Sequence, residues 1–490
     1  MRNLSNGSGR CSGITETLAR FRLRLQSITI IFSFLLRSLY QYCIGTFTLL
    51  LYCLYVPTFN TIIFALASMA ALPMAPGCLI SGWMMESFGR RTSQYIICAP
   101  LLLGWILIAS GLLMGKILQG LAFGLFMPLR SVFIGEYTSP RHRGGFLAII
   151  CLAKTFGILF VHLVGSVTSY KITSLISMVF PITSLIMMVY SPESPSWLAT
   201  QNKYEECRKA FMWLRETEEV HELERMIQAS KLLDNKQTQK HNRIQEISSI
   251  AKKKEFYKPV ILMFAMYIIL HFSGGTLMGS YAVTVLNLLM GPDVEAHAWM
   301  VALDAQRLFF SIVAIYAINR FKRRTMLFTT GTINVGSLLA MAVYSFLKTK
   351  CLLPYESLWI PGTLINLQIF SVAMGMASLP GVIAGEVFPL QYRALGGSVS
   401  LIASAGSIFV LLKTFSGLIS VMGFHGTFTV YAGVMMGCLG VAAVLLPETS
   451  SRTLQQIEEH FRGEPLDLEA DDKEKEPLRS KLENYHETQT

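Results

Sequence analysis

The sequence contains little charge. Only 15% of its 490 residues are Asp, Glu, Lys or Arg, whereas a soluble domain is about 25% charged. Hydrophobic residues make up 52%, and the mean hydropathy is +0.46. This composition argues against a large soluble domain and is typical of a protein that crosses a membrane several times.

Three further absences narrow the function. The 9 cysteines form no CxxC pair and have no regular spacing, so they indicate neither a disulfide framework nor a metal site. The chain has no Gly-rich lysine motif to cradle phosphate, which argues against an ATP-driven pump. Nothing before Arg24 has the form of a cleavable signal peptide, so the first apolar run should remain as an uncleaved signal. We expect no cofactor, no metal and no enzymatic activity.

The net charge of +11 has a membrane explanation. The basic residues cluster in short segments between apolar runs, as they do in cytoplasmic loops under the positive-inside rule. With both termini inside, Arg90, Arg91, Arg143, Arg323 and Arg393 all lie on the cytoplasmic face. We therefore expect a lipid bilayer, and no nucleic acid, as the partner of the chain.

Apolar runs long enough to cross a bilayer recur along the sequence. A spanning helix needs roughly 20 mainly apolar residues, and about twelve runs meet that length. They cover residues 28–56, 62–84, 95–113, 117–136, 146–168, 172–190, 259–288, 298–318, 326–347, 358–386, 395–420 and 425–446. The sequence therefore predicts an all-α membrane protein.

The apolar runs fall into two groups separated by a polar segment rich in Lys and Glu. We expect a cytoplasmic N-terminus (1–27), an N-terminal six-helix half (28–190), a cytoplasmic linker with short helices (191–257), a C-terminal six-helix half (258–448), and a cytoplasmic C-terminal helix with a disordered tail (449–490). The tail has few large apolar residues, which is why it is expected to be disordered.

A charged motif is repeated in the two groups and predicts two pseudo-symmetric halves. Each copy has a glutamate, a proline and then an arginine, and each half closes on Pro-Glu-Ser or Pro-Glu-Thr. The repeated positions are Glu136 with Arg143, Glu386 with Arg393, and Glu193 with Glu448.

Paired arginines occupy equivalent loops in both halves, and Glu136 and Glu386 are available to form forked bonds with them. Such pairs, formed when the cytoplasmic side is shut and broken when it opens, would supply a two-state element for transport. Alternatively, these residues only anchor the topology. The candidate gate residues are Glu86, Arg90, Arg91, Glu136, Arg143, Glu193, Arg323, Arg324, Glu386, Arg393 and Glu448.

The joint order and spacing of several motifs resemble the sugar porters of the major facilitator superfamily, particularly the insect facilitated trehalose and glucose transporters. The matching segments are Gly82 to Arg91, Gly115 to Gly120, Glu136 to Gly144, Pro192 to Leu198, Gly385 to Pro389 with Arg393, Lys413 to Phe415, and Pro447 to Phe461. The resemblance implies two six-helix halves around a central site that opens alternately to each side.

The sequence departs from this family where the resemblance places the sugar contacts. Amides that bond hydroxyls and aromatic rings that stack on sugars are replaced at most of these positions. The substituted residues are Cys151, Leu270, His271, Thr276, Gly381, Ser404 and Ala405. These departures indicate that this protein binds a different solute from the family members it resembles.

Ionisable residues inside spans are candidates for function. They are Arg37, Lys154, Asp304, Arg307 and Lys413. Asp304 and Arg307 share one helix face and are expected to pair. The candidate cavity residues are Cys151, His271, Thr276, Tyr281, Asp304, Gln306, Arg307 and Ser404.

The sequence predicts a plasma-membrane transporter of a small polar solute and favours a facilitative carrier of hexose or trehalose. The resemblance implies that a proton symporter would carry an acidic residue in its first span, where this sequence has none, which favours a uniporter. Two alternatives stay open: a carrier that uses Asp304 for protons or Arg307 for an anionic solute, and a non-transporting sensor whose sugar site has eroded.

Overall fold

The structure is a computed structural model that describes residues 70–111, 114–138, 143–214, 222–224, 226–228, 230–231, 250–352, 357–388, 393–449 and 454–463. The predicted first span with Arg37, most of the polar linker, and the tail beyond residue 463 lie outside these ranges. So do the side chains of Arg143 and Arg393.

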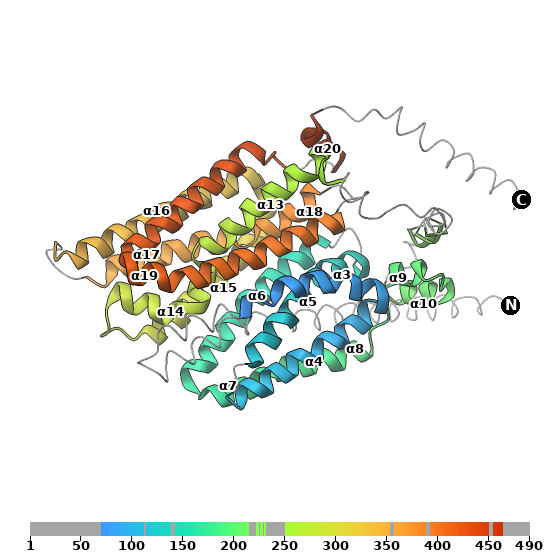
Figure 1. Cartoon of the computed structure of the whole chain (residues 1–490), viewed down its shortest axis with the longest axis horizontal. Coiled ribbons are helices and arrows are strands. Elements are labelled where there is room, and N and C mark those ends of the chain that lie inside the picture. Colours follow the sequence, from blue (N-terminus) through green and yellow to red (C-terminus); the bar gives the residue numbers. More distant parts are fainter. Residues whose placement is uncertain are drawn as a thin grey trace, which may run out of the picture.

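Every regular element in the described ranges is helical, and the helices form two groups that lie against each other (Figure 1). The N-terminal group contains α3 (Met74–Phe88), α4 (Arg90–Ala109), α5 (Met114–Tyr137), α6 (Arg143–Val167), α7 (Tyr170–Ser177) and α8 (Val179–Val189). The C-terminal group contains α13 (Lys254–Phe272), α14 (Gly275–Met290), α15 (Ala296–Arg320), α16 (Arg323–Thr349), α17 (Trp359–Ser371), η2 (Val372–Met376), α18 (Leu379–Val387) and α19 (Arg393–Leu445).

Three short helices lie at one end of the molecule, which we call the linker end. They are α9 (Pro195–Thr200), α10 (Tyr204–Leu214) and α20 (Leu454–Arg462) (Figure 1). Within α10, burial raises the pKa of the Cys207 thiol to about 11, so this thiol stays protonated at neutral pH.

The observed helices follow the predicted spans from the second to the twelfth. In the described residues, 8 helical stretches are long and apolar enough to cross a membrane. The stretch Leu395–Leu445 contains the last two predicted spans, which meet at a kink at Gly423. The predicted second and fifth spans correspond to α3 and α6. These observations confirm an all-α membrane fold.

Many large apolar side chains stay exposed along the helices, as a protein surrounded by lipid requires. Leu103, Val421 and Val444 are 53%, 83% and 83% exposed. Lipid tails form no hydrogen bonds with the chain. A helix suits them because it satisfies its own backbone hydrogen bonds and presents apolar side chains to the lipid. The exposed band therefore supports placement of these helices in a bilayer.

The two halves have separate apolar cores, and two helix pairs make the most extensive contacts between them. In one pair α6 packs against α15, and in the other α3 packs against α19. The second contact uses the small or flexible side chains of Ala71, Met74 and Ala405. Small residues let helix backbones approach closely in a membrane. The packing leaves the central cavity between the halves.

Candidate functional site

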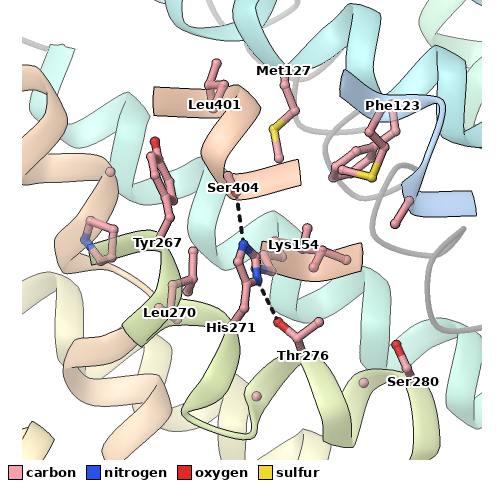
Figure 2. A pocket seen from close by; sticks show the side chains of 18 of the residues that line it. Phe123, Met127, Lys154, Tyr267, Leu270, His271, Thr276, Ser280, Leu401 and Ser404 are labelled. Atoms are coloured by element: carbon pink, nitrogen blue, oxygen red, sulfur yellow. Dashed lines mark hydrogen bonds between the residues drawn. The ribbon is translucent and has the colours of Figure 1, made fainter. Parts of the chain in front are cut away.

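A cavity of about 190 Å³ lies between the two halves. The N-terminal half contributes residues of α3, α5 and α6, and the C-terminal half contributes residues of α13, α14, α15, α18 and α19. Figure 2 shows the side chains of Phe123, Met127, Lys154, Tyr267 and His271 around this space. Because both halves line the cavity, a movement of one half against the other would change access to it.

Most of the residues predicted for the cavity do line it. Cys151, His271, Thr276, Arg307 and Ser404 are all in its wall. Two further positions at which the sequence departs from the sugar porters, Leu270 and Gly381, lie there as well. Residues far apart in the sequence are thus brought to one space, although their contact with a solute stays a prediction.

Three predicted cavity residues have other surroundings. Tyr281 is 1% exposed and stacks on Phe415 with 5.0 Å between ring centroids. The Gln306 side chain donates from Nε2 to the main-chain oxygen of Asn366 at 3.0 Å. Asp304 faces α6 rather than the cavity lining. The helical spacing predicted the correct helices for these residues but not the direction of each side chain.

His271 is held in the cavity wall by two hydroxyls. Its Nδ1 lies 3.0 Å from Thr276 Oγ1 and its Nε2 lies 2.9 Å from Ser404 Oγ (Figure 2). A neutral imidazole has one donor and one acceptor nitrogen, and a hydroxyl can take either role. The pair of bonds therefore joins α13, α14 and α19 without requiring a charge on the ring.

The helix that carries His271 is broken at Gly274, which has φ of 90°. The carbonyl of Ser273, beside the break, accepts from Asn334 Nδ2 at 3.1 Å and Gln368 Nε2 at 3.2 Å. A Cβ at Gly274 would lie 1.9 Å from Gln368 Nε2, so only glycine fits. Broken helices with satisfied carbonyls are typical of transporter cavities.

Asp304 and Arg307 do not form the expected pair in the described part of the chain. Asp304 on α15 is instead hydrogen-bonded to Nδ1 of His162 on α6, and both side chains are buried. About two turns away, the hydroxyls of Thr155 and Ser311 lie 3.3 Å apart. These contacts join the two halves. Arg307 is left 4% exposed, and its Nη1 makes no hydrogen bond to any described residue.

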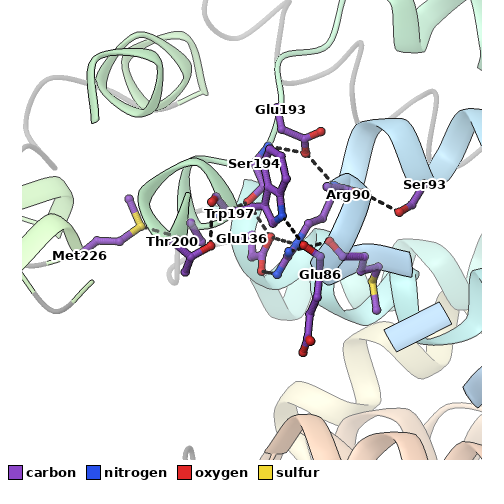
Figure 3. Close-up of polar contacts among 12 residues, drawn as sticks. Glu86, Arg90, Ser93, Glu136, Glu193, Ser194, Trp197, Thr200 and Met226 are labelled. Carbon is purple, nitrogen blue, oxygen red and sulfur yellow. Dashed lines mark hydrogen bonds and ion pairs between the residues drawn. The ribbon is translucent and has the colours of Figure 1, made fainter. Parts of the chain in front are cut away.

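At the linker end of the N-terminal half, a cluster of charged residues joins α4, α5 and the segment before α9 (Figure 3). The Arg90 guanidinium forms a forked pair with Glu136, with Nε to Oε2 at 2.8 Å and Nη2 to Oε1 at 2.7 Å. Glu193 accepts the backbone N–H groups of Arg90 and Arg91, at 2.8 and 3.0 Å. Its carboxylate therefore caps the N-terminus of α4.

Gly89, at the turn before α4, makes room for this cap. Its φ is 85°, and a Cβ there would lie 2.6 Å from Glu193 Oε2. Ser194 Oγ adds a 2.6 Å hydrogen bond to Glu136. A glycine is therefore needed directly before Arg90 and Arg91, because a carboxylate approaches its backbone closely.

The C-terminal half repeats the cluster. Arg323 Nη2 lies 3.4 Å from Glu386 Oε1, and Glu448 accepts the N–H groups of Arg323 and Arg324 at 3.0 and 3.3 Å. Arg324 Nη2 donates to Ala443 O at 2.8 Å, as Arg91 Nη2 donates to a carbonyl of α8 at 2.8 Å. Equivalent residues therefore make equivalent contacts, which explains the repeated sequence motif.

Each cluster holds together elements within one half or at its edge. Glu86 is exposed and joins through its main-chain oxygen, which accepts from Trp197 Nε1 at 2.9 Å. The side chains of Arg143 and Arg393 are not among the described ones. The hydrogen bonds and ion pairs given above for the other gate residues join elements of the same half, and the predicted latch across the cytoplasmic side stays a prediction.

Sequence reasoning overlooked some residues of the site. Arg130 lines the cavity from α5, where a charge inside an apolar span could have drawn attention to it. Ser194 had no comparable signal, because it acts through a partner distant in the sequence. His162 does lie inside a predicted span, but a histidine there is more often packed than a ligand, and only the structure brings it to Asp304.

Comparison with known proteins agrees with this architecture. Residues 60–461 match the family described as "Sugar (and other) transporter", and the chain belongs to that family. It is 24% identical over 401 residues to the facilitated trehalose transporter Tret1 of Drosophila mojavensis, covering 80% of this chain and 46% of the relative. It is 23% identical over 394 residues to Tret1 of Bombyx mori, covering 79% of this chain and 77% of that protein. The chain thus spans about half the length of the Drosophila relative.

Solved structures show the same fold. A proton:xylose symporter, XylE, bound to 6-bromo-6-deoxy-D-glucose, superposes with a TM-score of 0.68 at 16% identity, covering 90% of this chain and 99% of the other. The inward-open xylose transporter XylE from E. coli gives a TM-score of 0.66 at 15% identity, covering 89% and 99%. The predicted major facilitator fold is confirmed, and the family is one of transporters rather than enzymes.

Proposed function

We propose that this protein carries a small sugar across the membrane by facilitative transport, with its two halves moving to open the cavity to each side in turn. The observation that carries the proposal is the cavity lined by both halves of a sugar-transporter fold. Ligand pockets commonly measure about 300–1,000 Å³, and this cavity is about 190 Å³. The cavity is therefore a small one, which suits a small solute such as a sugar.

Gly381 offers a direct test of this proposal. It lines the cavity, and a Cβ placed on it meets no atom within 4 Å. A branched aliphatic side chain at this position would occupy the space that the solute needs without offering a ring for a sugar to stack on. We expect Gly381→Leu to lower the initial rate of labelled hexose uptake into liposomes by about tenfold, equivalent to about 1.4 kcal/mol.

Gly433→Leu is the matched control, because a Cβ placed on Gly433 also meets no atom within 4 Å and this glycine does not line the cavity. Its uptake should remain close to that of the original protein. Equal uptake by both variants, or hexose binding without uptake by the original protein, would count against transport through this cavity. The second result would instead support a sensor.

We further infer that the two charged clusters keep the helices of each half together while the halves move. The forked pair of Arg90 and Glu136 and the equivalent pair of Arg323 and Glu386 support this role. A rigid half is what a rocking movement needs, since packed elements shift between discrete arrangements.

We propose that the protein lies in the plasma membrane with both termini and the linker in the cytoplasm. The supporting observation is the basic charge of the linker-end loops, including Arg90, Arg91, Arg323 and Arg324. Cys351 is exposed and follows α16, whose other end carries Arg323 and Arg324. This orientation places Cys351 outside the cell.

In intact cells, a variant that keeps only Cys351 should react with a membrane-impermeant maleimide. A variant that keeps only Cys207 should stay unlabelled even after permeabilisation, because burial raises the pKa of that thiol to about 11. Labelling of the Cys351 variant only after permeabilisation would reverse the proposed orientation.

A further inference from the structure

The described lining of the cavity is positively charged. Arg130 on α5, Lys154 on α6 and Arg307 on α15 all contribute to its wall, and no Asp or Glu is among the described residues that do. The sequence has no acidic residue between Glu16 and Glu86, so the predicted first span brings no carboxylate either. The cations come from both halves and therefore surround the space.

The lining also has many hydrogen-bond donors and few acceptors. Arg and Lys side chains only donate, whereas carboxylates accept and carboxamides and hydroxyls can do both. No Asn or Gln is among the described lining residues, the hydroxyls of Thr276 and Ser404 are already bonded to His271, and Tyr267 and Ser280 supply the other hydroxyls of the described lining. A neutral sugar needs acceptors for its hydroxyl protons, so this wall suits a ligand that brings its own acceptors.

Arg307 is the strongest element of this wall. It is 4% exposed, and Nη1 makes no hydrogen bond to a described residue. The neighbouring carboxylate, Asp304, is hydrogen-bonded to His162 on the other half. A buried guanidinium with an unsatisfied N–H group is unfavourable, and an anion with two oxygens matches its planar fork.

We propose that the cavity selects a sugar that carries a negative charge, either a carboxylate as in a uronic acid or a phosphate monoester. Resting on the proposed transport function, this inference identifies the substrate class of the same site. Arg307 binds the anionic group in a forked manner, and Lys154 on the opposite half adds a second attraction. Binding the anion from both halves couples occupancy to their relative position.

The test uses the purified full chain in liposomes with labelled glucuronate, glucose 6-phosphate and glucose in separate arms. Movement of a single negative charge responds to voltage, whereas movement of neutral glucose does not. An inside-positive potential of about 60 mV, set by a potassium gradient and valinomycin, should raise the accumulation of glucuronate about tenfold. The arm that responds identifies the anionic group.

Variants then connect the charge selectivity to the cavity. Arg307→Gln should raise at least tenfold the concentration of anionic sugar that half-inhibits the uptake of labelled glucose. Arg307→Lys, which retains the charge but not the fork, should restore part of this inhibition. Lys350→Gln is the control, because Lys350 is an exposed cation that follows α16 and does not line the cavity. That variant should behave like the original protein.

Two failures can be told apart. Voltage-independent glucose uptake that neither glucuronate nor glucose 6-phosphate inhibits would overturn this inference and leave the proposed sugar transport intact. Absence of uptake in every arm, with protein that unfolds cooperatively on heating, would overturn both. Equal anion inhibition in Arg307→Gln and the original protein would also overturn the assignment of Arg307.

Discussion

Replacing Arg90 with alanine is expected to destabilise the protein by about 3 kcal/mol, whereas the equivalent Arg323→Ala should cost about 1.5 kcal/mol. The Arg90 pair with Glu136 is forked and short, with 15% and 17% side-chain exposure. The Arg323 pair with Glu386 is a single 3.4 Å contact with a more exposed carboxylate. Removing Arg90 therefore takes two charge-assisted hydrogen bonds from the more buried of the two carboxylates.

The measurement is the midpoint of thermal unfolding in detergent for single and double variants. In a double-mutant cycle of Arg90→Ala and Glu136→Gln, the coupling should exceed that of Arg323→Ala and Glu386→Gln. Arg90→Lys keeps the charge and should show an intermediate loss if the alanine variant does not fold. Equal and small effects in both halves would mean that these residues only anchor the topology.

Asp304→Asn is expected to lower the transport rate by at least about tenfold, because an amide removes a negative charge next to the buried Arg307. It also changes the hydrogen bond to His162 that crosses between the halves. Ser311→Ala is the control, since it removes the neighbouring cross-half contact to Thr155 without changing any charge. Its effect should be a few-fold at most. Similar losses in both variants would show that the charge of Asp304 is not what matters.

The same variant tests energy coupling. We expect uptake by the original protein, at zero membrane potential, to stop when the inside concentration equals the outside concentration, whatever the pH gradient. Asp304→Asn should slow this approach without changing its end point. Accumulation several-fold above the outside level, abolished by a protonophore and absent in Asp304→Asn, would show that Asp304 carries a proton and that the protein is a symporter.

The arrangement of spans and the two related halves could be predicted from the sequence because they depend on local properties. Hydropathy over about 20 residues identifies a helix that can cross a bilayer, whatever packs against it. The repeated glutamates and arginines also indicated their partners, since Arg90 does pair with Glu136 and Arg323 with Glu386. The capping of helix N-termini by Glu193 and Glu448 was not predicted.

What the tertiary structure alone decided is the direction of each buried polar side chain. The spacing of Asp304 and Arg307 places them on one helix face, and a local pair was therefore expected. Packing of α6 against α15 instead brought His162 to Asp304. With α15 in this orientation about its axis, Arg307 lies in the cavity wall and Gln306 is hydrogen-bonded to α17. Sequence periodicity defines a face but not its neighbour, because the neighbour depends on how distant helices pack.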